Sequence, residues 1–86
     1  MKIQITQEDI DKGKMCNSYD CPGALAIQRA LNTKKVSVRE RYVTVFESAS
    51  YQIPTPPVLR EFIDAYDANE IVKPIEFELD FQGLVP

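Results

Sequence analysis

Cysteine is the residue type in this chain best suited to nucleophilic chemistry, and Cys21 stands at the start of a predicted helix. Backbone N–H groups at a helix N-terminus favour a thiolate, and Lys14 lies a few residues upstream. A cysteine hydrolase normally recruits histidine as its base, however, and the sequence contains no histidine. Because buried cysteines are usually inert, we expect Cys21 to pack or cap the helix, with a thiol enzyme as the alternative. We therefore predict no enzyme activity and no catalytic residue.

The two cysteines are also a poor basis for a metal site. Two thiols without histidine cannot complete a four-ligand zinc site within one chain unless carboxylates are added, and a site of four thiolates would need two chains, so we predict no metal and no cofactor. Free thiols are expected in a reducing compartment, although the short gap between Cys16 and Cys21 would permit a local disulfide.

Charged residues offer two candidate binding sites. An exposed hairpin and the acidic face of a later helix are the candidate surface for a protein partner: Arg39, Glu40, Arg41, Tyr42, Glu61, Asp64 and Asp67. An overlapping set of cations with one aromatic ring could hold an anion or nucleotide by charge and stacking: Arg29, Lys34, Lys35, Arg39, Arg41 and Tyr42. The structural alternatives are a solvated helix face for the acids and protection of an edge strand for the cations. General nucleic-acid binding is not expected, because the pI is about 4.8.

The elements that must position these residues follow from the hydrophobic periodicity. A strand at 3–6 leads to one helical turn at 7–13 that Thr6 caps, and an almost wholly apolar helix then runs to Leu31. Either Asp20 or Cys21 caps this helix, Asp20 having the better capping side chain, and Asn32 ends it. Strands at 36–39, 42–46 and 51–53 form a meander with turns at 39–41 and 48–50.

The next element is an amphipathic helix with a clear spacing of apolar residues. Thr55 is its expected cap, and Asn69 or Glu70 its expected end. The apolar positions recur at i, i+3, i+4 and i+7: Leu59, Phe62, Ile63 and Tyr66. Strict alternation of apolar and polar residues over 75–81 then predicts a final strand.

These elements predict an α+β fold. A single small sheet, antiparallel or mixed, with both longer helices on one face would bury every apolar stripe. If the third strand of the meander is ignored, the order β-α-β-β-(β)-α-β is that of a ferredoxin-like split βαβ fold. The 86 residues predict one domain over 1–83, as a monomer or small homo-oligomer. Residues 84–86 match the start of a thrombin-site linker and are expected to be either an added tail or native sequence.

No apolar run in the sequence approaches the roughly 18 residues that a membrane span requires. The N-terminal residues also lack the apolar segment of a signal peptide. We therefore expect a cytoplasmic protein with no membrane partner.

Two motifs carry a resemblance to a known group of proteins. Residues 6–13 follow the pattern T-x-x-D-I-x-x-G, and residues 21–29 follow C-P-x-A-L-A-x-x-R, before a terminal F-E-L strand. In this order the chain resembles small uncharacterised proteins encoded by bacteriophages and prophages. The resemblance brings no catalytic residues. It implies a non-enzymatic accessory role in a bacterial host: blocking a host protein, as an anti-CRISPR-like anti-defence inhibitor does, or sequestering a signalling nucleotide.

Overall fold

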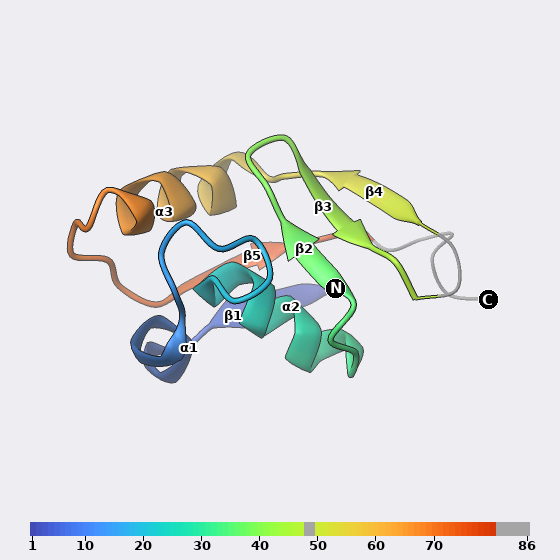
Figure 1. Ribbon diagram of the computed structural model, residues 1–86, viewed down its shortest axis with the longest axis horizontal. Coiled ribbons are helices and arrows are strands. Elements are labelled where there is room, and N and C mark those ends of the chain that lie inside the picture. Colours follow the sequence, from blue (N-terminus) through green and yellow to red (C-terminus); the bar gives the residue numbers. More distant parts are fainter. Residues whose placement is uncertain (48–49, 81–86) are drawn as a thin grey trace.

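Three helices and five strands make up the part of the chain that the computed structural model describes, residues 1–47 and 50–80, in the order β-α-α-β-β-β-α-β (Figure 1). The helices are α1 (Gln7–Lys12), α2 (Pro22–Leu31) and α3 (Pro57–Asp67). The strands are β1 (Lys2–Ile5), β2 (Val36–Val38), β3 (Tyr42–Val45), β4 (Tyr51–Pro54) and β5 (Ile75–Glu78). The predicted α+β class is confirmed, and each predicted element within the described residues is present.

The strands form two sheets, so the prediction of a single sheet is wrong. β1 pairs with β5 in antiparallel register, with Ile3 opposite Phe77. β2, β3 and β4 form an antiparallel meander, with Val38 opposite Val43 and Val43 opposite Ile53. Among the described residues the two sheets share no strand pairing, which rules out the single sheet of a ferredoxin-like fold. The order of elements along the chain does not determine which strands pair, and this is why the topology could not be predicted from it.

Helix α2 is the element that joins the two sheets. It contacts β1 of the two-stranded sheet, β2 of the meander, and both other helices. Ala24, Ala26 and Ile27 are buried, as the almost wholly apolar sequence of this helix leads one to expect. The two longer helices therefore do not lie side by side on one sheet, because α2 packs between sheets and α3 packs on α2.

The structure decides between the two predicted caps of α2 and corrects the predicted cap of α3. Cys21 caps α2, although Asp20 has the better capping side chain, and the Cys21 sulfur accepts the N–H of Ala24 at 3.4 Å. The predicted cap of α3, Thr55, instead donates its hydroxyl to the carbonyl of Arg39 at 2.8 Å, and α3 begins at Pro57 with Pro56 at the cap position and no side-chain cap. Asn32 ends α2 in the left-handed conformation, as predicted, with φ of 54°.

The C-terminal boundaries also differ slightly. Helix α3 ends at Asp67, two or three residues before the predicted end, and Asn69 takes a left-handed φ of 61° just beyond it. β5 ends at Glu78, whereas the predicted strand continued to residue 81. Residue 81, most of the predicted turn at 48–50, and the tail at 84–86 lie outside the described residues.

The start of α1 is fixed to the end of α2 by a buried carboxylate. Asp9 and Thr6 form a reciprocal capping box. The backbone nitrogen of Thr6 donates to the Asp9 carboxylate at 2.9 Å, and the backbone nitrogen of Asp9 donates to the Thr6 hydroxyl at 3.2 Å. Asp9 is only 4% exposed and also accepts two hydrogen bonds from the guanidinium of Arg29, at 2.7 and 3.0 Å. Gly13 packs so closely on Pro22 that an added Cβ would lie 2.7 Å from the ring. The two sequence motifs therefore dock directly onto each other.

Candidate functional site

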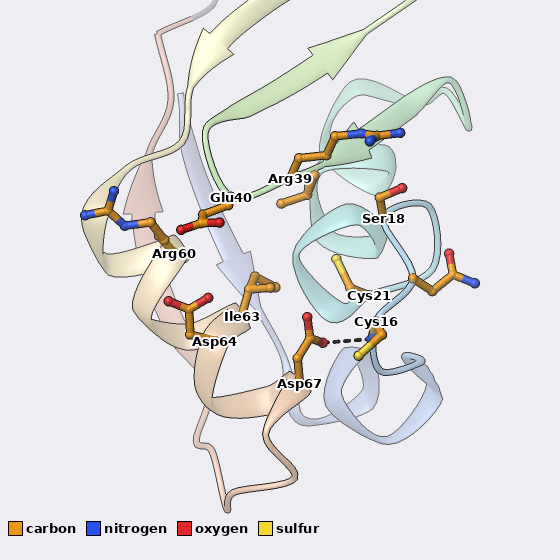
Figure 2. Close-up of a pocket in the computed structure, with 11 residues that line it drawn as sticks. Cys16, Ser18, Cys21, Arg39, Glu40, Arg60, Ile63, Asp64 and Asp67 are labelled. Atoms are coloured by element: carbon orange, nitrogen blue, oxygen red, sulfur yellow. Dashed lines mark hydrogen bonds between the residues drawn. The ribbon is translucent and has the colours of Figure 1, made fainter.

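A groove opens at the start of α2, between the tip of the β2–β3 hairpin and one face of α3 (Figure 2). Its volume is about 380 Å³. Three segments far apart in the sequence supply its walls: the loop before α2, the hairpin tip and α3. This groove is the candidate functional site, because it gathers residues from both halves of the predicted protein-binding surface.

Backbone hydrogen bonds hold two of the walls in place. The N–H of Val38 donates to the carbonyl of Ser18 at 2.8 Å, which ties β2 to the loop before α2. At the hairpin tip, the N–H of Arg39 donates to the carbonyl of Tyr42, and Thr55 bonds the carbonyls of Arg39 and Arg41. The position of the hairpin tip at the rim of the groove is therefore fixed largely by main-chain hydrogen bonds.

The floor of the groove is apolar. It is formed by Cys21 and Val38, both nearly fully buried, and by Ile63, which is half-buried. Gly23 permits this close packing of α2 on α3, since an added Cβ would lie 2.9 Å from Leu59.

Cys21 has the environment of a packing and capping residue. Burial raises the pKa of the Cys21 thiol and outweighs the hydrogen bonds from the backbone at the start of α2. The helix N-terminus therefore does not produce the thiolate that a nucleophile requires. Cys16 is exposed, and both thiols are free.

Charged side chains of both signs surround the apolar floor: Arg39, Glu40, Arg60, Asp64 and Asp67. None of them forms an ion pair within residues 1–47 and 50–80. Figure 2 shows the arginine side chains of positions 39 and 60 extending in opposite directions from the groove. The rim therefore offers charges of both signs that the fold itself does not neutralise.

Asp67 has one contact of its own across the groove. Its carboxylate accepts the N–H of Cys16 at 2.8 Å, drawn as the dashed line in Figure 2. Cys16 adopts a left-handed φ of 55°, which is uncommon for a residue with a side chain. The bond links the loop before α2 to the last turn of α3.

The groove contains part of the predicted protein-binding set and adds a residue to it. Arg39, Glu40, Asp64 and Asp67 line it, whereas Arg41, Tyr42 and Glu61 do not. Arg60 also lines the groove and was not among the predicted site residues. Its position could have been inferred, because residues 60, 64 and 67 have the i, i+4, i+7 spacing of one helix face.

The predicted anion-binding set is spread over different parts of the molecule. Arg29 is already engaged with Asp9 and with the carbonyl of Gln4. It lines a hollow at the end of α2 together with Lys34, while Arg39 lines the groove at the other end of that helix. Lys35, Arg41 and Tyr42 line neither of the two. Nucleotide binding by this set remains a prediction.

Two further properties concern the described residues as a whole. Within them, no group of three or more cysteine, aspartate and glutamate side chains is placed to hold a metal ion. None of their helices has the length and apolarity that crossing a membrane demands. Comparison of the chain with protein-family models, with curated proteins and with solved structures finds no match to any of them.

Proposed function

We propose that this chain is a non-enzymatic binding protein that takes a segment of a protein partner into the groove at the start of α2. The observation that carries the proposal is the anatomy of that groove, in which an apolar floor is ringed by charged side chains that form no ion pair within the described residues. Protein interfaces have this arrangement, with a dry apolar centre and a polar rim. The complementary segment would place an apolar side chain over Cys21 and Ile63 and charged side chains at the rim.

The charges of the rim indicate how such a partner would be selected. Asp64 and Asp67 lie one helical turn apart on α3 and would favour a basic residue in the partner. Glu40 lies across from them on the hairpin side, and the two arginines would favour acidic residues at the ends of the bound segment. Charges of this kind contribute chiefly to specificity and association rate, while the apolar floor contributes to the lifetime of the complex.

A matched pair of substitutions on α3 tests the groove. Asp64→Lys reverses a charge that lines the groove, whereas Glu61→Lys makes the same change on the same helix outside it. Each tagged variant is used to capture proteins from bacterial lysate beside the wild type. We expect Glu61→Lys to retain the captured partner and Asp64→Lys to lose most of it. Equal recovery by both variants contradicts the groove as the docking site.

The resemblance to phage-encoded proteins suggests the setting of this binding. We propose that the partner is a host protein in the bacterial cytoplasm and that the complex blocks it, as an anti-defence inhibitor would. Expression of the chain in bacteria that carry a defence system should then raise the plating efficiency of a sensitive phage. The Asp64→Lys variant should lose this effect and Glu61→Lys should keep it.

A further inference from the structure

Ile71 is the most exposed large apolar residue among those described, with 97% of its surface open to solvent. It lies in the connection between α3 and β5. The end of α3 places it there, because Asn69 in the left-handed conformation turns the chain and Glu70 donates its N–H to the carbonyl of Ala65 at 3.0 Å. The turn is thus complete before Ile71, whose side chain is left without packing partners.

A hollow of about 660 Å³ lies beside this residue. Its apolar lining comes from Ile10, Met15, Tyr66, Val72 and Ile71 itself, and Met15 is half-exposed. Gln7 and Asn69 are among its polar lining residues, and the Tyr66 hydroxyl is hydrogen-bonded to the carbonyls of Ile10 and Gly13. The hollow is therefore partly apolar, and it is large enough to receive an isoleucine side chain.

Two opposite charges flank the hollow. Lys14 and Glu70 both line it, and neither forms an ion pair in the described part of the chain. A single copy thus carries a protruding apolar residue, a hollow to accept one, a cation and an anion on one surface. A surface that holds both halves of each contact is complementary to itself.

We infer that this surface binds a second copy of the same chain. Across a two-fold axis, Ile71 of each copy would enter the hollow of the other, and Lys14 of each would face Glu70 of the other. Every contact would then be made twice, as a two-fold interface requires. The inference does not depend on the groove, since it concerns a different surface and its test measures only molecular mass.

Sedimentation equilibrium of the full chain over a range of concentrations tests the first part of this inference. We expect the wild type to dimerise reversibly. Ile71→Asp places a charge where each copy buries an isoleucine, and it should weaken association by at least about a hundredfold. Val58→Asp is the matched control, because Val58 is also an exposed apolar residue but lies at the other end of α3. It should leave the association unchanged.

The charges permit a second test that does not depend on apolar burial. Lys14→Glu alone and Glu70→Lys alone should each dimerise less well than the wild type, because like charges then face each other. A mixture of the two variants should form the heterodimer in preference to either homodimer, since both of its charge pairs are again opposite. The double variant should also recover self-association. Circular dichroism shows whether each variant is folded.

Three outcomes would overturn the inference. If the wild-type chain stays monomeric, with a dissociation constant for the dimer above about 1 mM, the chain does not bind a second copy of itself specifically through this surface. Dimers that survive Ile71→Asp, or that Val58→Asp disrupts equally, place the contact elsewhere. A statistical mixture from the two charge variants shows that Lys14 and Glu70 do not meet.

Discussion

Arg29 and Arg60 both lie on the exposed side of a helix, but only Arg29 is bound by the fold. Arg29, in the last turn of α2, donates two hydrogen bonds to the buried carboxylate of Asp9 and one to the carbonyl of Gln4. Arg60, on α3, lines the groove and forms no ion pair in the described residues. The region around Asp9 therefore uses its charges to hold helices together, whereas the groove charges form no ion pair within the described residues.

The same comparison explains what the two sequence motifs do. Four of their fixed residues, Thr6, Asp9, Cys21 and Arg29, cap a helix or join α1 to α2. A fifth, Gly13, permits the contact with Pro22. The two motifs thus maintain the fold. The charged residues of the groove rim lie outside both motifs.

The largest difference we predict is between the two cysteines of the groove. Cys21 is 2% exposed and burial raises its thiol pKa, whereas Cys16 is exposed. With iodoacetamide near neutral pH, we expect Cys21 to react on the order of a hundredfold more slowly than Cys16, because it reacts only when the structure opens. Peptide mass spectrometry at timed intervals measures both rates. Equal alkylation rates of the two cysteines in the folded protein would contradict the inert environment of Cys21 and favour the thiol-enzyme alternative. In urea, where both thiols are exposed, we expect equal rates, and this measurement is the control.

The next effect concerns the stability supplied by Arg29. Arg29→Met keeps much of the side-chain length but leaves the buried Asp9 carboxylate with only its capping bonds. We expect a loss of about 2 kcal/mol in the free energy of unfolding, less than for a fully buried pair because the Arg29 side chain is half-exposed. Urea denaturation at pH 7 measures it. A loss no larger than that of Lys12→Met, which breaks an exposed ion pair with Glu8, would show that the Asp9 contact stabilises little.

Some of the features behind these predictions could be predicted from the sequence, and others could not. The spacing of Leu59, Phe62 and Tyr66 predicted α3, because helix periodicity is a local property. Nothing local indicated that Arg29 would reach Asp9, twenty residues earlier in the chain. The split into two sheets depends equally on distant pairings, since β1 joins β5 from the opposite end of the chain.

The groove was only partly predictable for a similar reason. Arg39 and Asp64 were predicted to be exposed and charged from the hairpin and helix patterns, and both line it. Their meeting depends on how α3 packs on α2 around Gly23. Thr55 illustrates the limit of a local rule, because a good capping residue bonds to the hairpin when a carbonyl of Arg39 lies within reach.

The contribution of Asp9 should also depend on pH. Burial raises the pKa of the Asp9 carboxyl, but the hydrogen bonds from Arg29 and Thr6 outweigh it and leave that pKa below the ordinary value of 3.8. The unfolded chain therefore binds the proton more readily. The stability from this lowered pKa is present above about pH 4 and is lost as the pH falls through the folded-state pKa.

Arg29→Met should remove most of that dependence. We expect the stability difference between wild type and Arg29→Met to shrink by about 1 kcal/mol between pH 7 and pH 3. Urea denaturation at several pH values measures it, and the other carboxyl groups cancel in the difference. A difference that stays constant or widens on acidification would mean that Arg29 does not lower the pKa of Asp9.

The smallest effect is expected for the same substitution in the groove. Arg60→Met makes the change of Arg29→Met on an exposed arginine that has no ion pair among the described residues. We expect the free energy of unfolding to change by no more than about 0.5 kcal/mol. Urea denaturation beside Arg29→Met gives the comparison directly. A loss approaching that of Arg29→Met would mean that the groove charges stabilise the fold. An unchanged stability would show that Arg60, unlike Arg29, does not help to hold the fold together, as the proposed role of Arg60 in binding requires.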